Sequence, residues 1–285
     1  MSISIVLPAK NEAIAIGDTI RGIRKYYPNA ELIVVDDGSV DDTAVIAEAA
    51  GAQVIRQPYS KGNGAAIKAG LRAASNEVVV CMDADGQHRP EDIVPLQQKL
   101  EAGYDMVVGA RNREGQAGLH RSMANGFYNK FASWMVGHKV EDLTSGFRAV
   151  KRKKFLEFIS LLPNKFSYPT TITMSFFRAG YSVGYVPITV LRRAEGSKSH
   201  INLWKDGVRF LLIIFKVGTL FSPLKLFFPI SLALGGGGVI YYAYTYLTDG
   251  RFTNMGALLF TTSILVFLMG LVSEQVTALM YKDKG

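Results

Sequence analysis

The sequence is poor in cysteine. Its 285 residues include one, Cys81, so no disulfide can form within the chain. Chains without disulfides fit a reducing compartment. The N-terminus also lacks a basic segment before its first apolar run, residues 3–7, and that run is too short for a signal peptide. We therefore expect the N-terminal part of the chain to remain in the cytosol and Cys81 to be a small buried residue of a strand.

Nucleic-acid-binding modules are missing as well. The formal charge of +8 would suit nucleic acid, an anionic lipid surface or a phosphorylated substrate. However, the chain has neither the spacing of a zinc finger nor an aromatic RNA-binding signature. We predict no nucleic-acid partner, and we attribute the positive charge to lipid and phosphate.

Short apolar runs alternate with helical patterns over about the first 110 residues. Strands are predicted at residues 3–7, 32–35, 53–55, 77–82 and 105–108, and helices at 12–26, 41–50, 62–74 and from about 91. Further helices are predicted at 120–136 and 168–180, and an extended segment at 183–191. This alternation indicates an α/β fold of Rossmann type, with a mostly parallel sheet covered by helices on both faces. Ligands of such sheets bind beyond the carboxyl ends of the strands.

Two long apolar runs close the chain. Residues 222–247 carry one charge, Lys225, and residues 255–279 carry one, Glu274. Each run is long enough to cross a bilayer core, which takes about 20 residues, and the short connection predicts a hairpin. Residues 201–221 mix basic and apolar side chains around Trp204, as in a helix that lies on an anionic leaflet. We therefore expect a catalytic domain over 1–200, an amphipathic interfacial helix over 201–221, and a transmembrane hairpin with a short tail over 222–285.

Basic residues gather on one side of the hairpin. They are Lys205, Arg209, Lys216, Lys225, Lys282 and Lys284, and the connecting loop holds only Arg251. The positive-inside rule then predicts a multi-pass protein of the cell membrane with its catalytic domain and both termini in the cytoplasm. Four successive glycines, residues 235–238, favour close contact between helices, for example between protomers, or reflect the tolerance of membrane helices for glycine.

Paired carboxylates follow one of the predicted buried strands. Asp83 and Asp85 flank the small residue Ala84, and Gln87 and His88 come shortly after. Mg²⁺ prefers oxygen ligands and is commonly held by one or two carboxylates together with substrate phosphates. Such a metal would neutralise the charge that builds on a departing nucleoside diphosphate. An Asp-x-Asp pair alone is a weak signal because it also caps helices, but its place at a strand end favours a diphosphate site.

Two further polar segments contain candidate ligand-binding residues. Asp36-Asp37-Gly38-Ser39 ends another strand, and its carboxylates suit either hydrogen bonds to a base or ribose, or a turn with a helix cap. Lys61-Gly62-Asn63-Gly64 precedes a helix, so its backbone N–H groups could approach a phosphate. This segment lacks the spacing of a Walker loop and is not a dinucleotide fingerprint directly after the first strand, which disfavours a kinase or a dehydrogenase.

Together these motifs resemble the family 2 glycosyltransferases of GT-A fold. The matching segments are VLPAKNE at residues 6–12, VVDDGS at 34–39 with Asp41 and Thr43, KGNG at 61–64, and MDADGQH at 82–88. Two later segments resemble the polyprenyl-phosphate branch of that family: DLTSGFR at 142–148, and Arg192-Arg193 with residues 197–199. That branch includes dolichyl-phosphate mannose synthases and bacterial undecaprenyl-phosphate sugar transferases, and the hairpin is similar to that of the bacterial members.

The resemblance implies roles for individual residues. Nucleotide-binding residues would be Pro8, Asn11, Glu12, Asp37, Lys61, Asp83 and Ala84. A divalent cation, Mg²⁺ or Mn²⁺, would be held by Asp83, Asp85 and Gln87. The catalytic group would comprise Asp85, Arg121, Asp142, Arg193 and Lys198, with the three basic residues on substrate phosphates and Asp142 near the sugar. Lys10 stands where many members carry a tyrosine or another uncharged residue.

The resemblance also implies the reaction. A sugar would pass with inversion from a UDP- or GDP-sugar to a polyprenyl phosphate at the cytosolic face of the membrane, releasing a nucleoside diphosphate. A phosphate acceptor is already anionic and needs no general base, so catalysis would rest on positioning and charge neutralisation. Related bacterial enzymes imply a homo-oligomer such as a tetramer.

Other functions stay open on the sequence. A membrane polysaccharide synthase would act on a sugar hydroxyl, but the chain lacks the Gln-x-x-Arg-Trp signature of those enzymes. A non-catalytic membrane partner with a degenerate transferase domain is disfavoured by the intact Asp83, Asp85 and Gln87, and a soluble nucleotidyltransferase by the hairpin. The sugar, the base of the donor and the length of the polyprenol are not specified by these motifs.

Overall fold

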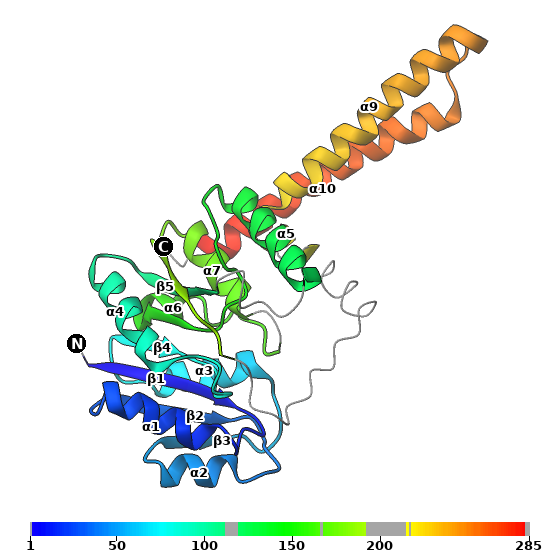
Figure 1. Cartoon of the computed structure of the whole chain (residues 1–285). Helices are drawn as coiled ribbons and strands as arrows, with labels where there is room; N and C mark the ends of the chain where they lie inside the picture. The colour runs from blue at the N-terminus through cyan, green and yellow to red at the C-terminus, as the bar shows by residue number, and fades with distance from the viewer. Residues whose placement is uncertain (1, 112–118, 166–167, 192–214, 217, 283–285) are drawn as a thin grey trace. The chain divides into compact units, whose positions relative to one another are not determined.

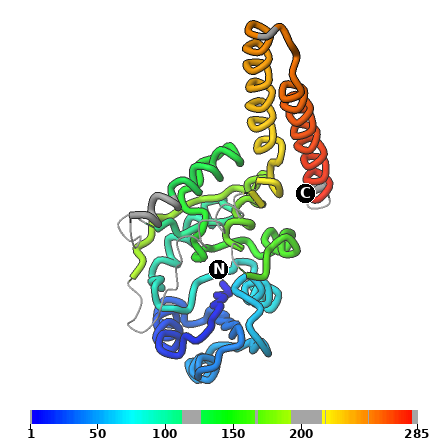
Figure 2. The backbone as a smooth tube through the Cα atoms, turned by 90° about the vertical axis from the view of Figure 1, so that its right-hand side faces the viewer, coloured from blue at the N-terminus to red at the C-terminus, as the bar shows by residue number. Residues whose placement is uncertain are grey.

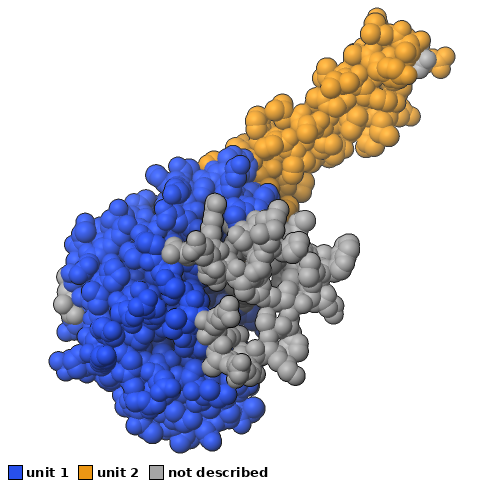
Figure 3. All heavy atoms as spheres, in the orientation of Figure 1, with its two compact units in different colours: residues 1–201 blue, residues 202–285 orange. Residues whose placement is uncertain are grey.

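The computed structural model describes residues 2–111, 119–165, 168–191, 215–216 and 218–282 (Figure 1). The chain divides into two compact units, residues 1–201 and residues 202–285 (Figure 3). Unit 1 contains the α/β fold, and unit 2 contains the two long apolar helices.

Unit 1 is built on a seven-stranded sheet. Its strands are β1 (Ile3–Ala9), β2 (Glu31–Asp36), β3 (Gln53–Arg56), β4 (Val78–Cys81), β5 (Met106–Arg111), β6 (Arg148–Lys151) and β7 (Val183–Ile188). Their order across the sheet is β3-β2-β1-β4-β6-β5-β7. β6 runs antiparallel to β4 and β5, and the other paired strands are parallel. The predicted mostly parallel sheet is therefore confirmed, whereas the antiparallel strand β6 was not predicted.

Helices cover both faces of this sheet. The described helices of unit 1 are α1 (Ile16–Tyr26), α2 (Thr43–Ala49), α3 (Asn63–Ala73), the 3₁₀ turn η1 (Pro90–Asp92), α4 (Ile93–Glu101), α5 (Leu119–Val136), α6 (Arg152–Glu157) and α7 (Tyr168–Arg178). Ile5 and Leu7 of β1 join one buried core with α1 and α4. Val6 points to the opposite face, where a Cβ placed on Gly70 of α3 would lie 2.3 Å from Val6 Cγ1. Each fully buried Ile or Leu contributes roughly 1.5–3 kcal/mol.

The carboxyl ends of β1, β2 and β4 come together at one edge of the sheet. Ala9, the last residue of β1, pairs with Asp36, the last residue of β2, and Val6 of β1 pairs with Cys81 at the end of β4. The segments that follow these strands contain Asn11, Asp37 and Asp83. Because the three strands are parallel, the motifs found in the sequence emerge side by side.

Unit 2 is an antiparallel pair of long helices (Figure 2). α9 (Pro223–Asp249) and α10 (Asn254–Lys282) contain two spans long and apolar enough to cross a membrane, Pro223–Thr248 and Asn254–Met280, with mean hydropathy 1.5 and 2.2. Only 11% of the most apolar window of each span is buried, so the apolar side chains point mainly outward. Outward apolar surface is the property of a helix that contacts lipid rather than of a helix in a protein core.

Glycines of both helices lie in the contact between α9 and α10: Gly235 and Gly238 of α9, and Gly270 of α10. A Cβ on Gly235 would lie 2.9 Å from Ser263 Oγ, and one on Gly270 would lie 2.8 Å from Phe227 Cβ. Ser263 also donates a hydrogen bond to the Ser231 carbonyl, at 2.8 Å. Small residues thus allow the close approach of the two helices. Of the interfacial helix predicted over 201–221, residues 215–216 and 218–221 are helical, and residues 201–214 and 217 lie outside the described residues.

Candidate functional site

The segments after β1 and β2 are held together by hydrogen bonds. The Asn11 N–H donates to Ser39 Oγ at 2.9 Å, and Asn11 Oδ1 accepts from the Val40 N–H at 2.9 Å. The Glu12 N–H donates to Thr43 Oγ1 at 2.8 Å. These bonds hold Asn11 in the left-handed region, with φ 55°, which asparagine tolerates better than most residues. The predicted helix from residue 12 therefore begins later, at Ile16.

Asp37 anchors the turn that contains Lys61. Its carboxylate accepts hydrogen bonds from Ser60 Oγ at 2.7 Å, from the Lys61 N–H at 2.7 Å, and from the Gly62 N–H at 3.0 and 3.1 Å. Lys10 Nζ in turn donates to Ser60 Oγ at 3.0 Å. The backbone amides of Lys61 and Gly62 are thus occupied by Asp37. The expectation that these two amides approach a phosphate is therefore corrected. Asp37 supports the turn, and its contact with the nucleoside stays a prediction.

The Asp83–His88 segment follows β4 at the centre of the sheet. Ala84 and Asp85 are buried, whereas the side chain of Asp83 is 37% exposed. Asp85 Oδ1 accepts the Gln87 N–H at 3.1 Å, which fixes the turn. His88 Nε2 lies 3.4 Å from Asp83 Oδ2, and the His88 ring stacks on Phe147 with centroids 4.9 Å apart. The buried His88 was not predicted as a site residue, and here it orients Asp83.

Gln87 connects this segment to the chain beyond β7. Gln87 Nε2 donates to the Leu191 carbonyl at 3.2 Å, and the Leu191 N–H donates to the Gln87 carbonyl at 2.9 Å. A glutamine binds a metal through its amide oxygen, so the bond made by Nε2 is compatible with the predicted ligand role of Gln87. The same bonds hold the chain immediately before Arg192 and Arg193.

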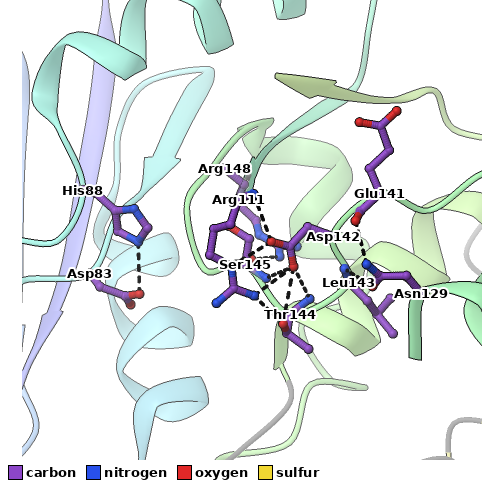
Figure 4. A network of polar contacts seen from close by, with 10 residues as sticks. All are labelled: Asp83, His88, Arg111, Asn129, Glu141, Asp142, Leu143, Thr144, Ser145 and Arg148. Carbon is purple, nitrogen blue, oxygen red and sulfur yellow. Dashed lines mark hydrogen bonds and ion pairs between the residues drawn. The ribbon is translucent and has the colours of Figure 1, made fainter. Parts of the chain in front are cut away.

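The half-buried Arg111 and the buried Asp142 form an ion pair beside Asp83 (Figure 4). Arg111 Nε donates to Asp142 Oδ2 at 2.7 Å, and one terminal nitrogen donates to Asp142 Oδ1 at 2.9 Å. The Thr144 and Ser145 N–H groups donate to the same carboxylate at 3.1 Å. Burial alone would raise the pKa of the Asp142 carboxyl, but the hydrogen bonds and charge of Arg111 outweigh it and hold that pKa below its usual value.

Asp142 therefore holds Arg111 and the 144–145 turn in place. Its oxygens accept hydrogen bonds from protein donors, which gives Asp142 a supporting role in this structure. Its predicted position near the sugar stays a prediction. Arg111 itself was missed in the sequence. The signal for it was its place at the carboxyl end of β5, the same rule that pointed to the aspartates.

A pocket of about 110 Å³ opens beside Asp83. It is lined by Asn63, Asp83, Thr144, Gly146, Lys165, Tyr168, Pro169 and Thr170. Two fully buried side chains, Arg148 and Tyr168, donate hydrogen bonds to backbone carbonyls around this pocket. Arg148 donates to the carbonyls of Ser145 and Pro169, the latter at 3.3 Å, and the Tyr168 hydroxyl donates to the Gly146 carbonyl at 3.2 Å. Among the described lining residues, Asp83 is the one carboxylate.

The other predicted site residues lie near the end of β1, on α5, or outside the described part of the chain. Pro8 is half-buried near the end of β1, and Glu12 is half-buried just after it. Arg121 belongs to α5, but its side chain lies outside the described part of the chain, as do Arg193 and Lys198 altogether. The described side chains contain no group of three or more His, Cys, Asp or Glu residues able to hold a metal.

Comparison with known proteins decides the family. Residues 4–158 match the profile of Glycosyl transferase family 2. The chain belongs to this family. It is a glycosyltransferase, and residues 222–279 match a second profile, the GtrB C-terminal hairpin. The resemblance stated from the sequence motifs is therefore confirmed.

Family 2 relatives are similar over most of the chain. Glycosyltransferase AglJ of Haloferax volcanii is 29% identical over 98% of this chain and 94% of its own length. The polyprenol monophosphomannose synthase of Mycolicibacterium smegmatis is 29% identical over 67% of this chain and 78% of its own. The undecaprenyl-phosphate 4-deoxy-4-formamido-L-arabinose transferase of Pseudomonas fluorescens is 27% identical over 99% of this chain and 86% of its own length.

A solved structure shares the fold of the family 2 domain. Glucosyl-3-phosphoglycerate synthase from Mycobacterium tuberculosis, crystallised with Mn²⁺ and UDP-glucose, is 25% identical, with a TM-score of 0.61 over 76% of this chain and 78% of that one. This similarity confirms the predicted GT-A-like fold.

Proposed function

We propose that this enzyme transfers a hexose from a nucleotide sugar, UDP- or GDP-linked, to a polyprenyl phosphate at the membrane. A phosphate oxygen of the lipid attacks the anomeric carbon, the bond from that carbon to the nucleoside diphosphate breaks, and the configuration inverts. The products are a polyprenyl-phosphate sugar and a free nucleoside diphosphate.

The observation that carries this proposal is the lining of the pocket beside Asp83. Its described side chains include one carboxylate, Asp83, and three hydroxyl residues, Thr144, Tyr168 and Thr170. A sugar hydroxyl acceptor needs a general base to remove its proton, whereas a phosphate monoester is already ionised at neutral pH. Asp83 is also needed for the donor site, so the described lining suits an anionic acceptor better than a hydroxyl.

Divalent-metal binding by Asp83, Asp85 and Gln87 is part of the proposal. Their donor atoms are oxygens, which hard cations such as Mg²⁺ and Mn²⁺ prefer. The described side chains offer no cluster of three acidic, His or Cys ligands, and this fits a cation that shares its coordination with donor phosphates. When bound, the cation would neutralise charge on the departing diphosphate.

The surface of α5 supports a lipid acceptor. Phe127 and Trp134 are 61% and 48% exposed, and they stand seven residues apart, close to two helical turns. Phe131 lies between them along the chain, with its ring centroid 5.8 Å from that of Trp134. Lys130 is exposed on the same helix, and the sequence of α5 contains no acidic residue. Exposed aromatic and basic side chains together are typical of helices that lie on an anionic membrane surface.

Two relatives with similar sequences support the same acceptor. One is a polyprenol monophosphomannose synthase and the other an undecaprenyl-phosphate transferase. We further propose that the catalytic domain and both termini are cytoplasmic. Basic residues lie near the N-terminal end of α9 and the C-terminal end of α10, and such residues favour the cytoplasmic side.

Transfer of radiolabel tests the proposed function. The purified full chain in nanodiscs is incubated with undecaprenyl phosphate, Mn²⁺ or Mg²⁺, and a panel of labelled UDP- and GDP-sugars. We expect one donor to label the organic phase and chelation of the metal to abolish the labelling. Label in a water-soluble sugar or polymer would instead support a polysaccharide synthase, and no transfer from any donor would contradict the proposal.

A further inference from the structure

The Lys61-Gly62-Asn63-Gly64 turn lies directly against the backbone of residues 163–165. A Cβ placed on Gly64 would be 2.0 Å from the Pro163 carbonyl oxygen, and one on Gly62 would be 2.6 Å from the Asn164 carbonyl oxygen. The Ala65 N–H donates to that Asn164 oxygen at 2.9 Å. Only glycine permits so close an approach of two backbones, so the glycines of this turn serve contact with the protein itself.

Side chains fix the turn and its neighbour in place. Lys68 of α3 donates to the Leu162 carbonyl at 3.0 Å and to Asn164 Oδ1 at 2.5 Å. Asp37, which directly follows β2, accepts the N–H groups of Lys61 and Gly62. The turn is therefore a fixed platform between the end of β2 and residues 162–164.

Lys165 follows this platform and lines the pocket beside Asp83. Asp83 and Lys165 are the two charged side chains among the described lining residues. Asp83 is committed to a cation in the proposed function, which leaves the ammonium group of Lys165 to pair with a substrate anion. Lysine is a compact cation with three donors and is well suited to phosphate oxygens.

We propose that Lys165 binds a substrate phosphate in this pocket and that residues 61–64 are the platform that positions it. The assignment rests on the proposed function for the identity of the substrates. The phosphate belongs either to the donor diphosphate or to the acceptor monoester. Both present the same oxygen ligands, and separate binding experiments distinguish them.

Binding to Lys165→Met tests the assignment without transfer. The full chain in detergent is titrated with UDP and GDP in the presence of Mn²⁺, and separately with farnesyl phosphate as a short acceptor. Loss of a charged hydrogen bond is expected to weaken one of these probes at least about tenfold, with partial recovery in Lys165→Arg. Lys153→Met, which changes an exposed lysine of α6 outside the pocket, serves as the matched control and should bind as the wild type does.

Each outcome has a distinct meaning. Weaker nucleotide binding assigns Lys165 to the donor, and weaker farnesyl phosphate binding assigns it to the acceptor. Equal binding of all probes by Lys165→Met and the wild type, or no binding by the wild type, would overturn the assignment. Phosphate binding that depends on Lys165, combined with no sugar transfer by the wild type, would refute the proposed function and leave the assignment standing.

Gly64→Ala tests the platform. The added Cβ must displace the Pro163 carbonyl, so it should weaken the same probe as Lys165→Met although Lys165 is still present. Gly126→Ala is the control, since no described atom lies within 4 Å of its Cβ position. If Gly64→Ala fails to fold, Lys68→Met, which removes the bonds to Leu162 and Asn164, provides the same test. Unchanged affinity in a folded variant would contradict the platform.

Discussion

At the scale of single residues, the polar groups of the site divide into exposed and enclosed ones. Asp83 is partly exposed in the pocket, whereas Asp37 and Asp142 are buried and satisfied by protein donors. Buried carboxylates of this kind stabilise the loops around them because removing their donors leaves unpaired polar groups. Mutations of the two classes should therefore differ in whether they change binding or stability.

Asp85→Ala should abolish metal-dependent nucleotide binding. A cation supplies several kcal/mol to stabilisation of a leaving group, so transfer should fall at least about a hundredfold. The measurement is the thermal shift given by UDP or GDP with Mn²⁺, together with the initial rate. Asp18→Ala, at an exposed aspartate of α1 paired with Arg21, is the control. A full thermal shift in Asp85→Ala would show that Asp85 is not a metal ligand.

Asp142→Asn should lower stability more than nucleotide binding. It leaves Arg111 without a charged partner. Because the Arg111 side chain is 28% exposed, the cost should fall below the ~3–5 kcal/mol of a fully buried pair. The pKa of Asp142 is lowered in the folded state, so its stabilisation is present above the unfolded value of about 3.9 and is lost as the pH falls through the folded value. Thermal unfolding between pH 7 and pH 3 should show a shallower acid decline in Asp142→Asn. Identical profiles would contradict the importance of this pair.

At the scale of helices and strands, the sequence located most of the parallel sheet. Apolar runs such as 32–35 and 77–82 correspond to β2 and β4 because buried parallel strands are apolar on both faces. β6 was missed since its four residues, Arg148–Lys151, contain only two apolar side chains. The role of the glycines at 62 and 64 was also beyond prediction, because it depends on contact with residues about one hundred positions away.

The same limit applies to the candidate site. Its aspartates were predictable because they directly follow strands. The partners of Asp37 and Asp142, and the place of Lys165 in the pocket, depend on tertiary contacts that carry no local pattern.

The α5 surface makes a prediction about Trp134. The chain has two tryptophans, so Trp204→Phe leaves Trp134 as the single emitter. In nanodiscs with anionic brominated lipids, its fluorescence should be blue-shifted and quenched. A control chain with both tryptophans replaced and Val45→Trp, at a 55% exposed position of α2, should not be quenched. No quenching of Trp134 would contradict contact between α5 and lipid.

At the scale of the whole molecule, two units with different surfaces are joined in one chain. Unit 1 has the charged loops and pocket of a family 2 transferase, and unit 2 exposes apolar helices. Under the proposed function, the enzyme receives its lipid acceptor from the membrane without extracting it into water.

Cysteine labelling tests the proposed topology. Burial raises the pKa of the native Cys81 thiol to about 12, so it should not react with maleimide in the folded protein. Val40→Cys, at a 92% exposed position of unit 1, should react only after cells are lysed. Asn254→Cys, at the exposed start of α10, should react with an impermeant maleimide in intact cells. The reverse pattern would invert the topology.

The reversed direction of β6 determines which loop reaches the pocket. A parallel strand delivers the residues that follow it to the carboxyl edge of the sheet, as β4 delivers Asp83. β6 points the other way, and its first residue, Arg148, pairs with Cys81, the last residue of β4. It therefore delivers the residues that precede it, including Asp142, Thr144 and Gly146. Because β6 is antiparallel, Thr144 and Gly146 line the pocket beside Asp83 although they lie more than fifty residues further along the chain.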